Sequence, residues 1–223
     1  QKANIHYLCN EHTKSLSILD KLNTSSITRS QQVALYSLFK SIRVTMGSEF
    51  EIVMDRGVTL LQTYGVILHL DPEASLQNKL FLDKKIKNSE VFATPLQESN
   101  KAKRLNKSEK ELRSLLVDMW ESAYYQANLT LMSEVYLTLV SRSLKYGNSS
   151  ESAFGYVLYG SQLIDEGLYR KAYQFGKLSL SINRQFNDVV MLPKVHNFVA
   201  NFILPYVRNF NQNIALYEKS LIQ

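Results

Sequence analysis

One group of side chains, His6, Cys9 and His12, has a spacing that resembles a metal site. Residues three apart share a face of a helix, and imidazole and thiolate groups are zinc ligands. However, His6 and His12 are six residues apart, so on a helix they point roughly 120° from each other. No second pair of ligands follows at a zinc-like spacing. We therefore predict surface or structural roles for these residues and no metal site.

The sequence predicts no catalytic residue and no cofactor. As a nucleophile, Cys9 would need a positioned histidine base, and a small core residue within a helix is the simpler interpretation. His69 and His196 lie among apolar residues and are expected to be core or edge histidines with satisfied hydrogen bonds. Solvated or helix-capping roles are expected for a scattered set of carboxylates: Glu49, Glu51, Asp55, Glu134, Asp165 and Glu166.

Basic residues are concentrated in one stretch, residues 79–113. The chain has 26 Lys and Arg against 20 Asp and Glu, a net charge of +6. This stretch alone holds ten basic and five acidic residues, but only two aromatic ones, Phe81 and Phe92. Nucleic-acid sites interleave basic and stacking aromatic side chains, so we do not expect a nucleic acid here. A solvated loop is the first interpretation. A contact for an acidic protein surface is the second, with Lys101, Lys103 and Arg104 as candidates.

Tyrosines form a second group of candidate interaction residues. The chain has 13 Tyr and 10 Phe, and most of them have the spacing of helix cores. Tyrosine is nevertheless favoured at protein interfaces, because a rigid ring buries area while its hydroxyl stays paired. Our hypothesis is that Tyr124, Tyr125, Tyr156 and Tyr159 line a concave groove that receives a protein partner.

The elements that position these residues are predicted to be helices. Eight Gly and four Pro make up about 5% of the chain, against an average of about 12%. This scarcity disfavours turn-rich β folds and disorder. Apolar residues recur at three- and four-residue steps. The pattern predicts helices over 5–22, 28–45, 49–68, 72–86, 109–125, 129–146, 150–163 and 169–186, and one or two over 192–220 with a kink at Pro205.

Helix boundaries are predicted from residues with special backbone preferences. Gly47 and Gly147 should end helices, Asp71 should cap a helix that starts with Pro72, and Asn148 with Glu151 resembles a capping box. Two segments share an order of aromatic, small or branched, glycine and leucine residues: Phe50, Val53, Gly57 and Leu61, and Tyr169, Ala172, Gly176 and Leu180. Gly57 and Gly176 are therefore predicted at close helix contacts, as in stacked helical hairpins.

Residues 160–180 resemble a tetratricopeptide repeat. Gly160 and Ala172 stand where that motif has small residues, Tyr156 where it has a large aromatic, and Gly167 and Tyr169 at its usual turn. The resemblance thus implies a close helix contact at Gly160 as well. The resemblance implies an all-α fold, an irregular tetratricopeptide-like stack of antiparallel helical hairpins (an α-solenoid). We expect N-terminal hairpins in 1–87, a basic polar loop in 88–108 and C-terminal hairpins in 109–223.

A narrower resemblance covers about 122–180. The segments SLKYGNS (143–149), SAFGYVLYG (152–160) and YQFGKL (173–178) resemble the helical region of large bacterial and fungal signalling proteins. In that family a serine/threonine kinase-like domain and an AAA-type STAND ATPase domain precede this region, and a GAF domain and a sensor histidine kinase often follow. These 223 residues contain no P-loop and no kinase motif, so none of the family's catalytic residues is carried over.

The resemblance implies a non-catalytic scaffold or regulatory region of a multidomain signal-transduction ATPase or kinase. Its expected partners are other domains of the same polypeptide or a separate protein, and no membrane. The single cysteine fits a reducing compartment, and no signal peptide or membrane span is visible, so we expect a cytoplasmic location. The first residue is not Met, which suggests a piece of a longer protein. The alternatives are a free-standing peptide-binding adaptor and a weak nucleic-acid-binding module that uses residues 79–113.

Overall fold

The computed structural model describes residues 2–22, 27–47, 50–69, 71–96 and 105–207, and this part of the chain contains helices and no strand. The predicted all-helical class is therefore confirmed. The elements are α1 (Lys2–Leu8), α2 (His12–Asp20), α3 (Arg29–Met46), α4 (Phe50–Thr63), α5 (Pro72–Lys87), α6 (Glu90–Ala93), α7 (Lys107–Tyr125), α8 (Leu129–Tyr146), α9 (Ser150–Asp165), α10 (Tyr169–Phe186), α11 (Met191–Phe198), a π-helical turn (Val199–Ile203) and a 3₁₀ turn (Leu204–Tyr206).

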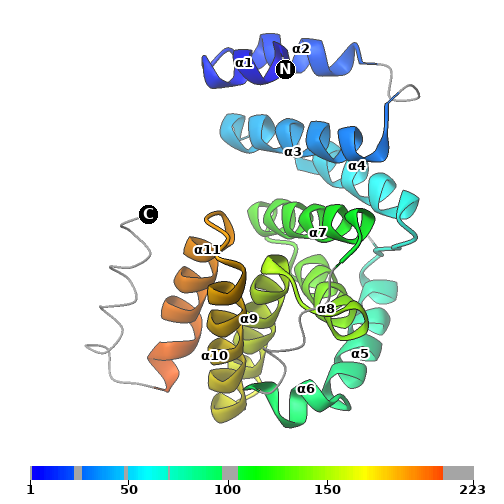
Figure 1. Ribbon diagram of the computed structural model, residues 1–223. Coiled ribbons are helices and arrows are strands. Elements are labelled where there is room, and N and C mark those ends of the chain that lie inside the picture. The colour runs from blue at the N-terminus through cyan, green and yellow to red at the C-terminus, as the bar shows by residue number, and fades with distance from the viewer. Residues whose placement is uncertain (1, 23–26, 48–49, 70, 97–104, 208–223) are drawn as a thin grey trace.

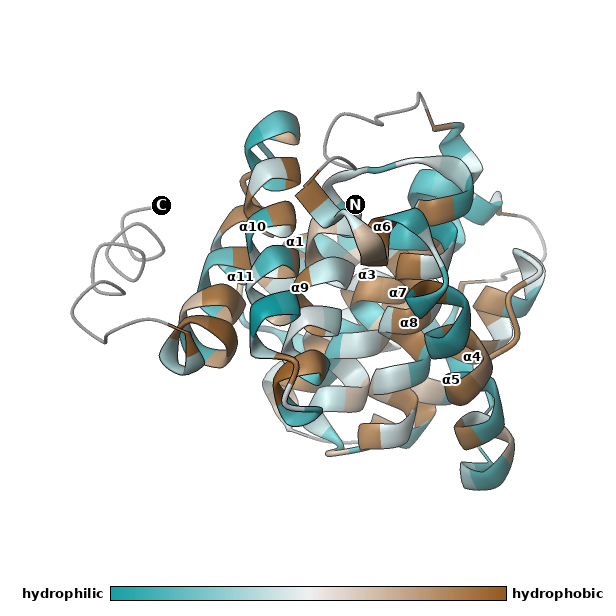
Figure 2. Ribbon diagram, turned by 90° about the horizontal axis from the view of Figure 1, so that it is seen from below, coloured by the Kyte–Doolittle hydropathy of each residue, from teal (hydrophilic) through white to brown (hydrophobic). Residues whose placement is uncertain are grey.

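The helices form one continuous stack (Figure 1). The short helices α1 and α2 contact each other and lie beside α3, and both α3 and α4 pack on α7. Helix α8 packs between α7, α5 and α9, and α9 in turn contacts α10 and α11. Apolar side chains from α1 to the 3₁₀ turn form a single core cluster. Helix α10 shows alternating apolar and polar patches around its axis, which is typical of an amphipathic helix (Figure 2).

Several predicted helix boundaries are confirmed. Gly47 ends α3 in the left-handed conformation with φ +64°, and Gly147 ends α8 with φ +94°. Asp71 caps α5 by accepting a hydrogen bond from the Ala74 N–H at 2.8 Å, and Pro72 is the first helical residue. The capping box is shifted by one residue from the prediction: Ser149 is the N-cap of α9, and its N–H donates to Ser152 Oγ at 2.9 Å.

The N-terminal segment differs most from the predicted helices. A single helix was expected over 5–22, but Asn10 has φ +61°, which separates α1 from α2. Cys9 therefore lies between two helices and is exposed, so the prediction of a core cysteine is wrong. Ile5 and Leu8, expected on an apolar face, are 59% and 74% exposed.

The other differences arise where helices stop. Helix α4 ends at Thr63, and residues 66–69 have no regular secondary structure, with Val66 and Leu68 buried. The predicted loop contains the short helix α6. At the C-terminal end, α11 passes into the π-helical turn before Pro205, whose ring nitrogen cannot donate a hydrogen bond. The predicted helix beyond residue 207 lies outside the described residues.

The glycines predicted at close helix contacts lie in such contacts. A Cβ atom at Gly160 would be 2.9 Å from Ile203 Cδ1 and 3.3 Å from both the Ala172 carbonyl oxygen and Phe175 Cβ. At Gly176 it would be 3.2 Å from Ile203 Cδ1, and at Gly57 it would overlap the Met119 sulfur. Helix α9 thus approaches the start of α10 and the π-helical turn so closely that any side chain at Gly160 would force its neighbours to shift.

Substitution of Gly160→Val should therefore destabilise the fold by about 1 to 3 kcal/mol, because the added methyl groups have no space between α9, α10 and the π-helical turn. The free energy of unfolding, measured by urea titration, tests this. Arg170→Val at an exposed position of α10 is the matched control, expected to lose about 0.5 kcal/mol from helix propensity alone. Equal losses for the two variants would show that the close approach is not important.

Candidate functional site

The clearest surface feature is a series of aromatic rings that we call the aromatic ladder. It starts at the first residue of α4, crosses the C-terminal turns of α7 and ends in the π-helical turn. Neighbouring ring centroids are 5.0 to 6.0 Å apart. The members, in order, are Phe50, Tyr125, Tyr124, Trp120, Phe198 and Phe202.

The ladder has exposed outer rings held by a buried centre. Tyr124 and Tyr125 are 53% and 55% exposed, whereas Trp120 is only 5% exposed. The Trp120 ring stacks on Tyr124 at 5.5 Å and makes an edge contact with Phe154 of α9 at 5.2 Å. Such aromatic pairs prefer these offset or edge geometries. The exposed tyrosines are thus presented in fixed positions rather than as free surface side chains.

A shallow cavity adjoins the ladder. It has a volume of about 520 Å³ and is lined by Phe50, Glu51, Ile52 and Gln126. The buried Gln126 Nε2 has no hydrogen-bond partner among the described residues. An unpaired buried amide N–H costs free energy, so the end of α7 is incompletely satisfied in the isolated chain. The site therefore combines rigid aromatic rings with a hollow beside them.

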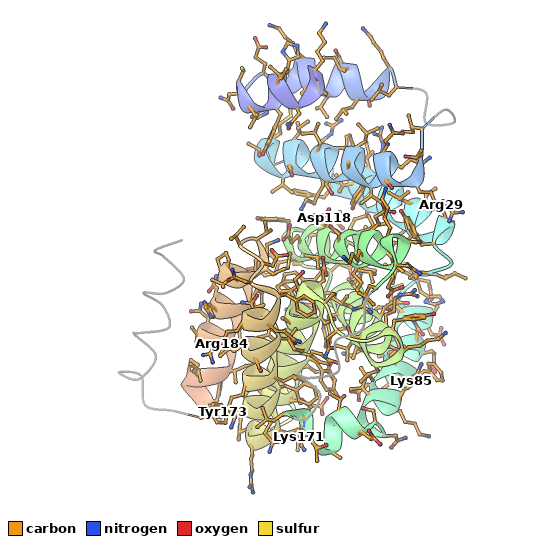
Figure 3. All side chains as sticks on the ribbon, viewed as in Figure 1. Arg29, Lys85, Asp118, Lys171, Tyr173 and Arg184 are labelled. Atoms are coloured by element: carbon orange, nitrogen blue, oxygen red, sulfur yellow. The ribbon has the colours of Figure 1, made fainter. Side chains whose placement is uncertain are left out.

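A charge cluster holds α7, and with it the ladder, against its neighbours. Lys40 of α3 reaches Asp118 Oδ1 and Glu121 Oε2 of α7, both at 2.6 Å, and Lys194 of α11 also pairs with Glu121. Asp118 lies on the side of α7 that faces α3 (Figure 3). Burial alone would raise the pKa of Glu121, but the charges of Lys40 and Lys194 outweigh it and lower that pKa. The carboxylate stays ionised, as the pairing requires.

Two of the four candidate tyrosines are in the core. Tyr156 and Tyr159 are 0% exposed, and both rings pack against Phe175 of α10. The Tyr159 hydroxyl donates to Asp83 Oδ1 at 3.1 Å, and burial, with the Asp83 charge, raises the pKa of Tyr159. The prediction that these two tyrosines line an open groove is therefore wrong. The predicted sites Lys101, Lys103 and Arg104 lie outside the described residues.

The predicted turn residues of the repeat are placed as follows. Gly167 has φ +75° between α9 and α10, and Ala172 is fully buried. Asn148 is buried and accepts a hydrogen bond from the Tyr156 hydroxyl at 3.3 Å. Tyr169 stacks on Tyr206 of the 3₁₀ turn, with centroids 6.2 Å apart.

The carboxylate of Glu134 is buried, which the sequence did not predict. It is 0% exposed, and it accepts hydrogen bonds from the His69 N–H at 3.0 Å, Ser75 Oγ at 2.8 Å and Asn78 Nδ2 at 2.6 Å. His69 Nδ1 lies 2.5 Å from Glu134 Oε1. The edge histidine was predicted correctly, but the solvated or capping role of Glu134 is wrong. Because Ser75 donates to the carboxylate and not to the imidazole, the cluster is no serine–histidine pair.

Arg113 was counted in the solvated basic stretch but is also fully buried. Its guanidinium donates to Glu109 Oε1 at 3.0 Å, and to the Gly147 carbonyl oxygen, Ser149 Oγ and Ser152 Oγ at 2.8 to 3.1 Å. The i, i+4 spacing of Glu109 and Arg113 was a signal for this pair. The prediction of a solvated Arg113 is wrong, because the residue joins α7 to the turn between α8 and α9.

Across the part of the chain that the structure covers, no three His, Cys, Asp or Glu side chains are grouped as a metal site would need. His6 Nδ1 instead lies 2.5 Å from Glu11 Oε2. None of the described helices is both long and apolar enough to cross a membrane.

The fold and site together define a helical protein with an exposed aromatic surface. No family model, curated protein or solved structure matches the chain.

Proposed function

We propose that this chain is a non-catalytic protein-interaction and regulatory scaffold within a multidomain signal-transduction ATPase or kinase. The observation that supports it is the aromatic ladder, where Tyr124 and Tyr125 are exposed on rings that buried neighbours hold in place. Rigid aromatic side chains supply much of the binding energy at protein interfaces, at low cost in conformational entropy. The ladder is the surface that receives another domain of the same polypeptide or a partner protein.

The helical arrangement in this proposal is an irregular tetratricopeptide-like solenoid. The pair α9 and α10 supports it, since Gly160 approaches the backbone of Ala172 and Gly167 makes the left-handed turn between the helices. In the proposed mechanism, the nucleotide state of a neighbouring ATPase domain changes how the hairpins dock and so biases an output domain. A stack of hairpins suits this role because each helix pair contacts mainly its neighbours.

Site-specific photocrosslinking in the full-length polypeptide tests the proposal. A benzophenone amino acid at position 124 should give one defined covalent product, because Tyr124 lies in the contact. Position 110 is the matched control: Lys110 is exposed near the other end of the same helix, about 20 Å away. The additional change Tyr125→Ala should lower the yield from position 124 about tenfold or more.

The product also separates the two forms of the proposal. A crosslink within the same polypeptide, found by mass spectrometry, identifies an intramolecular regulatory contact, and a crosslink to one other protein identifies an adaptor. If position 124 gives no more product than position 110, the proposed interaction surface is wrong.

A further inference from the structure

The outer face of α5 is a second exposed apolar surface. Leu76, Leu80 and Phe81 are 47%, 56% and 65% exposed, while Ser75, Leu82 and Ile86 on the other face are buried. Helix α5 packs on α8 and lies at the edge of the stack in both ribbon views, with no described helix on its outer side. Grouped apolar side chains that no neighbour covers are typical of interaction sites.

Two unneutralised lysines end this face. Lys84 and Lys85 are exposed and make no ion pair with any described residue, and Lys85 points away from the stack (Figure 3). Lys87, in the same turn, is paired with Asp83 and Glu166, both at 2.8 Å. Positive charge at a helix C-terminus is favourable in itself, but two adjacent free lysines beside an apolar patch also attract carboxylates.

The spacing of these residues defines the shape of the surface. Leu76, Leu80 and Lys84 form one i, i+4 row, and Gln77, Phe81 and Lys85 form the next. Two such rows enclose a groove along the helix, and a row of the same spacing on a second helix fits into it at about −50°. One wall of the groove is formed by Leu76 and Leu80 and the other by Gln77 and Phe81, and the groove ends between the two ammonium groups of Lys84 and Lys85.

We propose that the outer face of α5 (Leu76, Leu80, Phe81, Lys84 and Lys85) binds an amphipathic helix of a partner protein. The partner helix carries apolar residues at i and i+4, which fill the groove, and carboxylates that reach Lys84 and Lys85. This is the helix-in-groove mode of recognition, with electrostatic complementarity fixing the register.

The charge distribution favours a protein over an anionic membrane. Helices that lie on membranes carry Lys and Arg along the length of the polar face. On the outer face of α5 the free lysines Lys84 and Lys85 lie in the last turn, and the first turn of the same helix carries the exposed Glu73 behind the N-cap Asp71. Lys79, in the middle of the helix, falls on the other side, in line with the buried Ser75. The C-terminal end of the face therefore attracts negative charge and the N-terminal end repels it. A partner helix that is acidic at one end fits this distribution.

A designed peptide and its charge-reversed form test this directly. The probe is a fluorescent amphipathic helix of about five turns, with leucines at i and i+4 and two glutamates one turn further. Fluorescence anisotropy should show saturable binding to the chain that weakens with added salt. The double variant Lys84→Glu, Lys85→Glu should bind the probe with an affinity at least about tenfold lower. A probe with lysines in place of the glutamates should recover binding to that variant.

The control variant Lys110→Glu, Arg170→Glu makes the same change of charge at exposed positions elsewhere, and its affinity should stay within about twofold of the parent. Leu80→Asn should weaken binding about tenfold and leave the melting temperature unchanged, because the side chain is exposed. Equal losses in the two charge variants, or no saturable binding of the acidic probe, would overturn the proposal.

Vesicles of phosphatidylcholine and phosphatidylserine are the competing probe. The proposal is wrong, and the face binds membranes, if three results are found together. The chain sediments with the vesicles, the Lys84→Glu, Lys85→Glu variant does not, and the chain does not bind the peptide. The inference does not depend on the aromatic ladder, which lies on other helices. Failure of the photocrosslink at position 124 and failure of peptide binding to α5 are therefore separate results.

Discussion

Replacement of Arg113 by methionine should lower the free energy of unfolding by about 3 to 5 kcal/mol, because it removes one partner from a buried ionic network. The side chain is 0% exposed and bonds to Glu109 within α7, to the Gly147 carbonyl oxygen, and to Ser149 and Ser152 at the start of α9. Methionine keeps the length and apolar stem, but it removes the donor to the Gly147 carbonyl oxygen and leaves the buried Glu109 paired with Arg142 alone. Urea denaturation followed by circular dichroism measures the loss.

Arg142 is the matched comparison. Its guanidinium also pairs with Glu109, with Nε 3.0 Å from Oε1, but its side chain is 22% exposed. Arg142→Met leaves the inner Arg113–Glu109 pair intact, so a loss of about 1 kcal/mol is expected. Arg113→Lys should fall between the two, because an ammonium group cannot reproduce the planar, five-donor guanidinium. A loss for Arg113→Met no larger than that for Arg142→Met would contradict the assigned role.

The local parts of the fold could be predicted from the sequence. Helix α10 has the predicted bounds, Tyr169–Phe186, because its apolar periodicity and the turn at Gly167 are both encoded within the segment. Asp71 with Pro72 gave the start of α5 for the same reason. The break at Asn10 was missed, since Asn populates the left-handed conformation only in some contexts and the surrounding pattern continues through it.

The candidate site could be predicted only in part. Tyr124 and Tyr125 were proposed as exposed interaction residues, and the structure exposes both. Tyr156 and Tyr159 were grouped with them, although residues 152–160 are all buried. A helix that is apolar on all its faces is expected to be surrounded by other elements. Helix α9 is surrounded in this way, by α7, α8, α10 and α11. The partners of Trp120 come from α9 and α11, and no local pattern brings those rings together.

Arg113 and Glu134 were misplaced for a further physical reason. Charged residues are usually solvated, and a buried one is tolerated only when partners from other elements satisfy it. Apart from Glu109, which is four residues from Arg113, those partners are distant in sequence: residues 147–152 for Arg113, and residues 69–78 for Glu134. Which carboxylate or guanidinium is buried therefore depends on how the helices stack.

Glu134→Ala should be similarly costly, with an expected loss of about 3 kcal/mol in the free energy of unfolding. The carboxylate accepts from the His69 N–H, Ser75 Oγ and Asn78 Nδ2 in a fully buried position. Removing it leaves several buried donors unpaired, at about 1 to 3 kcal/mol for each group that finds no other partner. Urea denaturation of the variant measures the total.

Two further variants separate the network from a general loss of charge. Glu134→Gln keeps the volume and one acceptor oxygen, and Ser75 and His69 can reorient toward its amide, so about 1 to 2 kcal/mol should be lost. Asp165→Ala removes an exposed carboxylate at the end of α9 and should cost no more than about 0.5 kcal/mol. Similar losses for Glu134→Ala and Asp165→Ala would contradict the network.

The damage should also be local. Glu134 ties residues 66–69 and the first turns of α5 to α8, so hydrogen exchange should accelerate there in Glu134→Ala before it does in α10. Helix α5 loses its anchor at the end that carries Ser75, whereas the Lys87–Glu166 ion pair and the hydrogen bond from Tyr159 to Asp83 still hold its other end. Faster exchange confined to 66–78, with residues 82–87 still protected, is therefore the expected pattern, and uniform acceleration along α5 would exclude this two-point attachment.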